Sequence, residues 1–159
     1  MIEFIVPGQP VGKGRPRIGR VGGNSRMFTP AKTVSYEGLV AHAAHQAMAG
    51  RALVEGAVMV ELHIGCQVPA SWSKRKQAEA LAGTVYPTTK PDIDNVEKAI
   101  FDAMNGVVWK DDVQVCSVVK SKAYAAAPGV GVKVYPMASP STEAFADLAA
   151  RSMSAQGEV

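Results

Sequence analysis

The chain has 159 residues, of which 47% are hydrophobic, and it carries a formal net charge of +3 at pH 7. This size supports one hydrophobic core, so we expect a single domain over residues 1–137 and a flexible or weakly helical tail over residues 138–159. The sequence shows no apolar run of membrane-spanning length and no signal-peptide pattern at its start, which argues against a membrane protein and predicts a cytoplasmic one.

A basic segment follows the first predicted strand, which runs from Ile2 to Val6. Residues 1–35 contain six Lys or Arg residues against one acidic residue, a net charge of +5, whereas the remaining residues sum to −2. The Gly and Arg content predicts a mobile basic loop over residues 8–28 rather than a core element. Such a loop can contact DNA phosphates, so its cations are candidate DNA-binding residues: Lys13, Arg15, Arg17, Arg20 and Arg26. A solvated loop without a partner is the alternative.

A long helix and a long strand are predicted next. Thr29-Pro30 is typical of a helix start, with Pro at the first helical position, and the helix should run to about Met48. Residues 57–68 alternate between apolar and polar side chains, as in a half-buried strand. The predicted inner face of that strand consists of Val58, Val60, Leu62 and Ile64.

A short basic helix is predicted after Ser73, a favourable N-cap residue, and Gly83 should end it. Its first turn supplies three further candidate phosphate contacts: Lys74, Arg75 and Lys76. A charged first turn is more often a solvated face, so that alternative stays open.

The stretch KPDIDNVEKAIFDAMNGVVWKDD, residues 90–112, places acidic residues before and after a helical pattern. Asp94 suits the helix N-cap because Glu97, three residues later, completes a capping box. Apolar residues then recur at helical spacing and describe one buried face: Val96, Ala99, Ile100, Ala103 and Met104. Asn105-Gly106 ends this helix, and the chain should continue into a strand that carries Asp111 and Asp112.

The complete set of elements predicts an α/β (α+β) fold, in which two main helices pack on a small mixed β-sheet. Its last two strands are predicted at residues 113–125 and 131–135, with a turn at Pro128-Gly129 between them.

The acidic residues of this stretch predict a site for a divalent cation. Asp92 and Asp94 point to the same side if their segment is extended, and Lys98 lies one helical turn after Asp94. If the later acidic pair brings a third carboxylate to Asp92 and Asp94, the three would repel one another without a charge partner. Their companion should therefore be a cation. Oxygen-only ligands favour Mg²⁺, with Mn²⁺ as a substitute. The alternative is a purely structural role. Asp94 would then only cap the helix, Asp111 and Asp112 would lie in a turn, and Lys98 would pair with Asp102 at i+4.

The same stretch resembles the signature of the RusA family of Holliday junction resolvases, particularly its phage and prophage members. The shared pattern is Asp-x-Asp-Asn at a helix start, a Lys four residues on, and a later Asp-Asp. VPGQPVGKGRPR and VPASWSKRKQAEALAG extend the resemblance more loosely. It implies Mg²⁺-dependent, paired and symmetric cleavage of four-way DNA junctions by a homodimer, in recombination and repair and without a nucleotide cofactor. The implied catalytic residues are Asp92, Asp94, Lys98 and Asp112, of which the three aspartates bind the metal.

The resemblance makes Asp111 the less critical member of the acidic pair. In a continuous strand, Asp112 shares its phase with Lys120 and Lys122, which become candidate DNA contacts on the same polar face. A bulge after Asp112 would reverse that phase.

Three alternatives remain open at this point. The nuclease could act on flaps, D-loops or replication forks instead of four-way junctions. A module that binds branched DNA without cutting it would explain the basic segment but not the aspartates. A small-molecule metal phosphohydrolase would explain the aspartates but not the basic segment.

Overall fold

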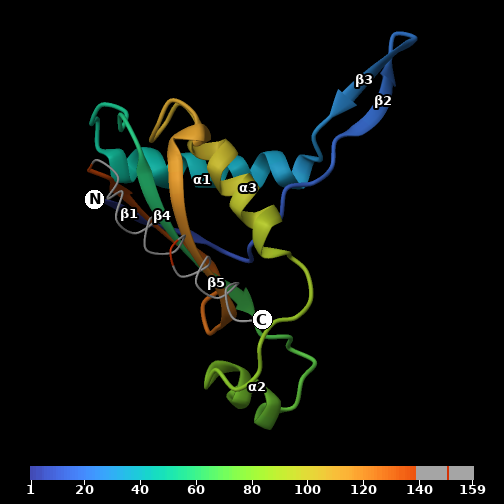
Figure 1. The fold of residues 1–159 in the computed structure, drawn as a ribbon. Helices are drawn as coiled ribbons and strands as arrows, with labels where there is room; N and C mark the ends of the chain where they lie inside the picture. The colour runs from blue at the N-terminus through green and yellow to red at the C-terminus, as the bar shows by residue number, and fades with distance from the viewer. Residues whose placement is uncertain (139–149, 151–159) are drawn as a thin grey trace, which may run out of the picture.

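The computed structural model describes residues 1–138 and residue 150, and it confirms the mixed α+β fold (Figure 1). One sheet has the strand order β1-β6-β4-β5, in which β4 and β5 are parallel and the other neighbours are antiparallel. Its strands are β1 (Ile2–Pro7), β4 (Val58–Gln67), β5 (Val115–Ala125) and β6 (Gly129–Pro136). A separate two-stranded sheet consists of β2 (Arg17–Val21) and β3 (Asn24–Phe28).

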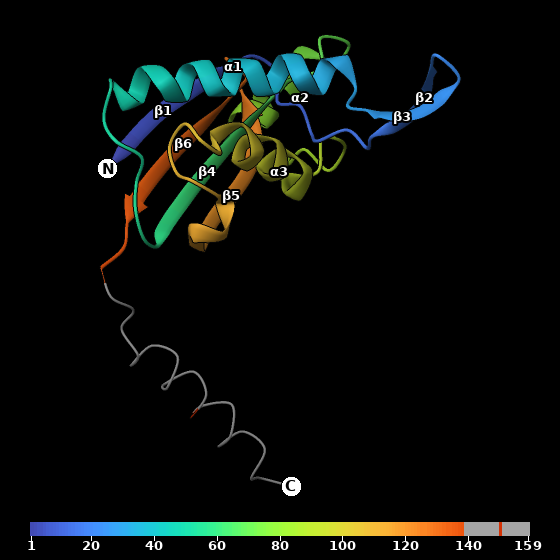
Figure 2. The ribbon, with the colours of Figure 1, turned by 90° about the horizontal axis from the view of Figure 1, so that it is seen from above.

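Two long helices, α1 (Ala31–Met48) and α3 (Ile93–Met104), cover one face of the four-stranded sheet (Figure 2). The short helix α2 (Lys74–Leu81) lies apart from them, and Ser73 Oγ accepts a hydrogen bond from its Lys76 amide at 3.3 Å, as the sequence predicts. Within the described residues, no helix is long and apolar enough to span a bilayer. Apart from residues 138 and 150, the predicted tail lies outside the described residues.

The core lies between the sheet and these two helices. The predicted inner face of β4 is confirmed. Its four side chains are each at most 2% exposed: Val58, Val60, Leu62 and Ile64. The helix α3 buries Val96, Ala99, Ile100 and Met104, while Ala103 is partly buried. Burial of a Val, Ile or Met side chain contributes roughly 1.5–3 kcal/mol, so this packing holds α3 firmly against the sheet.

Residues 17–28 of the predicted mobile loop instead form a β-hairpin, made of β2 and β3, whereas residues 8–16 contain no helix or strand. Val21 pairs with Asn24, so Gly22 and Gly23 form a two-residue turn, and their φ angles are +58° and +81°. Positive φ at both central positions is the requirement of a hairpin turn whose twist matches its strands. Two of the glycines that suggested mobility, Gly22 and Gly23, therefore close a regular turn.

Two helix starts differ from the prediction, by one residue in α1 and by two in α3. The helix α1 begins at Ala31 with Pro30 as its N-cap, rather than at Pro30 after Thr29. The helix α3 begins at Ile93 with Asp92 as its N-cap, which puts Asp94 at the second helical position and excludes the predicted Asp94–Glu97 capping box.

The predicted start of the strand that was expected to carry Asp112 is also wrong. A 3₁₀ turn covers Asp112–Gln114, and β5 begins only at Val115. Asp111 caps this turn by accepting a hydrogen bond from the Val113 amide at 3.2 Å, and the Gln114 side chain donates to the carbonyls of Val54 and Gly56, both at 2.9 Å. Asp112 therefore has no strand phase in common with Lys120 and Lys122.

Candidate active site

Asp92 and Asp94 are exposed at the N-terminus of α3. The Asp92 carboxylate accepts a hydrogen bond from the Asn95 side-chain amide at 3.3 Å, and its backbone carbonyl accepts from the Val96 amide at 3.1 Å. The unpaired N–H groups of a first helical turn carry partial positive charge, which favours carboxylates at this position. Local helix geometry therefore explains why two neighbouring aspartates are tolerated here.

Lys98 joins α3 to the turn that contains Asp112. Its ammonium lies 2.8 Å from Asp102 Oδ1 and 3.4 Å from Asp112 Oδ2. The hydrogen bond to Asp102 is the main cause that raises the pKa of Lys98, against a smaller opposing effect of burial. The pair with Asp102 is the i+4 contact that the structural alternative predicted, and the contact with Asp112 exists beside it.

Asp102 connects Lys98 to the basic segment. It was not predicted as a site residue, although its i+4 spacing from Lys98 is visible in the sequence. Its Oδ2 lies 3.0 Å from the Lys13 ammonium, which also pairs with Glu37 of α1. Burial alone would raise the pKa of the Asp102 carboxyl, but hydrogen bonds from Lys98 and Lys13 outweigh it and lower that pKa. Lys13 is thus attached to α1 and α3 together.

Two lysines of β5 contact α3 and the segment before it. Lys120 Nζ lies 2.5 Å from Glu97 Oε2. Lys122 Nζ donates to the backbone carbonyls of Thr89 and Pro91, at 2.9 and 3.0 Å. Both residues were predicted as DNA contacts, and in this structure their ammonium groups bind protein atoms: Lys120 binds Glu97, and Lys122 binds the segment that precedes Asp92.

The predicted ligands do not form a ready-made metal site. Within residues 1–138 and 150, no three carboxylate, imidazole or thiolate side chains lie close enough together to hold a metal ion. Asp112 contacts Lys98, whereas the Asp92 side chain contacts Asn95. Their oxygen donors fit a hard divalent cation in chemistry, but the side chains are not gathered around one point.

A groove of about 760 Å³ brings the basic segment to the start of α3. Its walls are formed by the segment before β2, the start of α1 and residues 90–95. Asp92 is the acidic residue in its lining, and five cations share it: Lys13, Arg15, Arg17, Lys32 and Lys90. Lys90 and Lys32 were not named as site residues, although Lys90 stands beside the acidic motif in the sequence.

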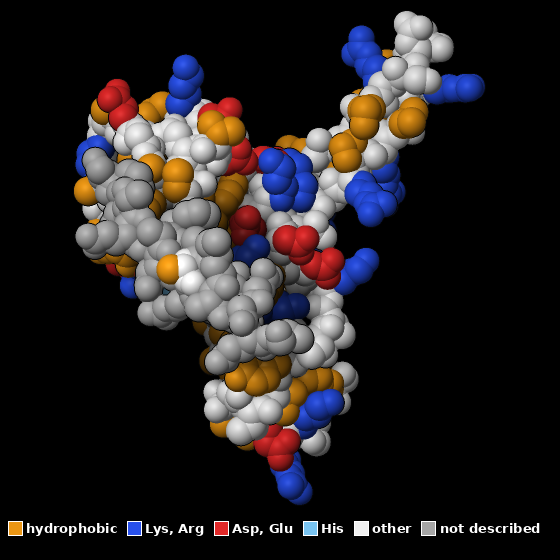
Figure 3. Space-filling model, in the orientation of Figure 1, with side chains coloured by type: hydrophobic (Ala, Val, Ile, Leu, Met, Phe, Trp, Pro, Cys, Tyr) orange, Lys and Arg blue, Asp and Glu red, His pale blue; other side chains and the backbone are white. Residues whose placement is uncertain are grey.

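The remaining predicted cations lie outside this groove. Arg20 and Arg26 are exposed on the hairpin, where Figure 3 shows basic and hydrophobic side chains next to one another. On α2, Arg75 pairs with Glu79 at 3.1 Å, and Lys76 lies 3.9 Å from the centre of the Trp72 ring. Since α2 and the hairpin leave the body at well-separated places (Figure 1), the structure does not gather Lys74, Arg75 and Lys76 with the predicted cations of the hairpin.

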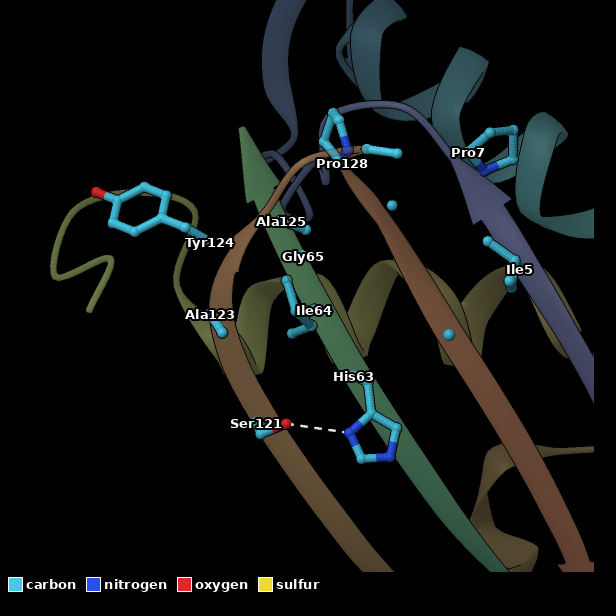
Figure 4. Close-up of a pocket in the computed structure, with 13 residues that line it drawn as sticks. Ile5, Pro7, His63, Ile64, Gly65, Ser121, Ala123, Tyr124, Ala125 and Pro128 are labelled. Atoms are coloured by element: carbon cyan, nitrogen blue, oxygen red, sulfur yellow. Dashed lines mark hydrogen bonds between the residues drawn. The ribbon is translucent and has the colours of Figure 1, made fainter. Parts of the chain in front are cut away.

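A second pocket, of about 550 Å³, lies on the face of the sheet away from α1 and α3 (Figure 4). Its lining is mainly apolar, with His63 Nδ1 at 3.1 Å from Ser121 Oγ. None of the predicted site residues lines it, so we place the candidate active site at the groove and the first turn of α3.

Comparison with known proteins agrees with the resemblance in the acidic stretch. Residues 7–135 match the family model described as endodeoxyribonuclease RusA. The uncharacterized protein YqaN of Bacillus subtilis (strain 168) is 38% identical over 135 residues, which cover 84% of this chain and 94% of that protein. The family match includes the groove, α3 and the Asp112 turn.

Proposed function

This chain belongs to the RusA endodeoxyribonuclease family, a family of metal-dependent nucleases that act on branched DNA, and we propose that it resolves Holliday junctions. The proposed reaction is hydrolysis of two symmetrically placed phosphodiester bonds, with Mg²⁺ as the metal and Mn²⁺ as a substitute. We place this activity in the cytoplasm and the gene in a prophage-like setting.

The observation that carries the proposal is the groove that joins five cations to Asp92. A polyanion is repelled by a carboxylate cluster, so a nuclease of this kind needs cations that hold the backbone against its acidic residues. A small-molecule phosphohydrolase has no use for cations that continue along an extended hairpin. A DNA duplex can contact cations along the whole hairpin, because its phosphate charges repeat along its length.

The proposed catalytic residues are Asp92, Asp94, Lys98 and Asp112, and the three aspartates are the proposed ligands. A bound Mg²⁺ would supply a water of lowered pKa and neutralise charge on the phosphate. Lys98 already contacts Asp112, and we propose that its ammonium stabilises the scissile phosphate or the leaving oxygen. Asp102 also contacts that ammonium, at 2.8 Å, which restricts where it can point.

The proposed DNA contacts are the cations of the groove and hairpin together with the basic residues of α2 and β5. Lys13, Arg15 and Arg17 line the groove itself. Arg20 and Arg26 extend the same charge along the hairpin, and the contacts predicted for Lys74, Arg75, Lys76, Lys120 and Lys122 stay predictions.

We also propose a two-fold homodimer. Resolution of a four-way junction requires two incisions in opposed strands, and two symmetry-related grooves would present one site to each strand.

The test compares a synthetic four-way junction with a matched duplex and a flap, in Mg²⁺ and in EDTA, for the wild type and Asp94→Asn. Paired nicks on the junction that need Mg²⁺ and are lost in Asp94→Asn, while junction binding persists, are the expected result. Equal cutting of the flap would broaden the substrate to other branched DNA. Tight binding without cleavage in Mg²⁺ or Mn²⁺ would contradict a nuclease and indicate a binding module.

A further inference from the structure

The hairpin of β2 and β3 carries a cross-strand pair of large, exposed apolar side chains on one of its faces. Residues opposite each other in an antiparallel pair project to the same side, and Ile18 lies opposite Met27. These two side chains are 77% and 70% exposed. On the other face, the Phe28 ring lies over Gly19, since a Cβ built at Gly19 would be 2.8 Å from it. We call the side with Ile18 and Met27 the apolar face.

Nothing in the described part of the chain covers the apolar face. The strands β2 and β3 pair only with each other there, and every residue of β3 is exposed. Figures 1 and 2 agree that the hairpin stands clear of the sheet and of both long helices. Two large apolar side chains held opposite each other on a projecting ribbon therefore indicate a binding surface rather than a fragment of the core.

The positive charge around the apolar face favours a polyanionic partner. No acidic residue occurs between positions 4 and 36, and Arg17, Arg20 and Arg26 all lie on the hairpin. The same hairpin of a second copy would carry the same positive charge and be repelled. A partner that is polyanionic and also offers flat apolar surface fits best, and exposed nucleic-acid bases next to phosphates have both properties.

We propose that the apolar face packs against base pairs that have lost a stacking neighbour at the branch point of a DNA junction. This inference rests on the proposed function and names the feature of the substrate that the hairpin recognises. Ile and Met are among the side chains that proteins insert at unstacked base steps. In an unbroken duplex each base pair is stacked on both sides, so the apolar face gains much less there.

The base of the hairpin is placed for this contact. Gly14 donates its amide to Thr33 Oγ1 at 3.0 Å, and the Lys13 amide donates to the Asn95 carbonyl at 2.8 Å. The hairpin therefore leaves the body at the groove, from a backbone that α1 and α3 hold. Arg15 and Arg17 line the groove and lead into β2, so a DNA backbone bound there would run toward the hairpin.

The test measures binding and base stacking in EDTA, with no cleavage, using the full-length protein. The substrates are a four-way junction with 2-aminopurine at its branch point and a duplex of the same sequence. The variants are Ile18→Ser/Met27→Ser, the conservative Ile18→Leu/Met27→Leu, and Ile5→Ser, whose side chain is 71% exposed on β1 far from the hairpin. Circular dichroism checks that each variant is folded.

We expect the wild type to raise 2-aminopurine fluorescence on the junction, and the serine double variant to lose that rise. Its junction affinity should fall about tenfold while its duplex affinity changes less than about twofold. The leucine double variant and Ile5→Ser should behave as the wild type. A folded serine variant that retains junction affinity and the fluorescence rise would overturn the inference.

Three other outcomes separate failure of this inference from failure of the proposed function. If the serine variant sediments as a smaller species without DNA, a second copy covers the apolar face and the inference is wrong. If the wild type gives the predicted fluorescence and affinities but never cleaves in Mg²⁺, the inference stands as branch recognition and the proposed nuclease activity fails. If the wild type binds neither substrate, both are wrong.

Discussion

The Lys98 ammonium lies 3.4 Å from Asp112 Oδ2, across 14 positions of the chain. This contact places the proposed catalytic lysine and one proposed ligand side by side, although they belong to different elements. Asp112 lies on the 3₁₀ turn, and Lys98 lies in the middle of α3.

Replacement of Lys98 should damage turnover more than binding. If the ammonium stabilises charge that develops in the transition state, Lys98→Ala should lower kcat roughly 100-fold or more and change junction affinity only about twofold. Single-turnover cleavage and a binding assay in EDTA measure the two effects. Lys110→Ala, at an exposed lysine near Asp112, serves as the control. A loss of affinity as large as the loss of rate would show that Lys98 only binds DNA.

Asp102 should make stability depend on pH in the acid range. Its pKa is lowered in the folded protein, because Lys98 and Lys13 outweigh the burial that would raise it. Its contribution is therefore fully present above the unfolded pKa of about 4 and is lost as pH falls through the folded pKa. Asp102→Asn should lower Tm at pH 7, and the difference from wild type should shrink below about pH 4. Thermal melts from pH 2 to 7 test this, with Glu55→Gln as a control; a constant difference would contradict it.

Lys122 should position the segment before Asp92. Its ammonium donates to the carbonyls of Thr89 and Pro91. Lys122→Met should therefore loosen that segment and raise the Mg²⁺ concentration for half-maximal cleavage several-fold, as supporting contacts of metal ligands typically do. Lys133→Met on β6, whose partner is Glu3 at 3.5 Å, is the matched control. If Lys122→Met instead changes only junction affinity, Lys122 is a DNA contact.

The hairpin arginines should contribute to the salt dependence of DNA binding. Each phosphate contact that is lost should reduce the slope of log affinity against log salt concentration by about one. Arg20→Ala and Arg26→Ala should each show this on duplex and junction alike. Arg75→Ala tests the separate prediction for α2. An unchanged slope for both hairpin variants would place the DNA backbone elsewhere.

The sequence predicted the elements whose side-chain pattern is strong. The alternation in β4 and the helical spacing in α3 identify their buried faces, because each pattern reports which side of one element meets the core. The four-residue spacing of Lys98 and Asp102 likewise identifies their contact, because it depends on a single helix.

Features that depend on two distant segments could not be predicted in this way. The pairing of Lys13 with Glu37 and Asp102 requires the packing of α1 against α3, and nothing in the local sequence reports that packing. The 3₁₀ turn at Asp112 depends on Gln114, whose side chain binds Val54 and Gly56 nearly 60 residues away. Where a tertiary contact interrupts an apparently regular strand, phase arguments based on the strand fail.

Lys13 attaches to the body in two ways, through its backbone to Asn95 and through its side chain to Glu37 and Asp102. The hairpin begins four residues later, at Arg17. A torque that bound DNA exerts on the hairpin can be absorbed in residues 14–16 and 29–30, or be transmitted to the starts of α1 and α3. If the torque is transmitted, the angle between two DNA arms would influence the position of the residues proposed to cut them.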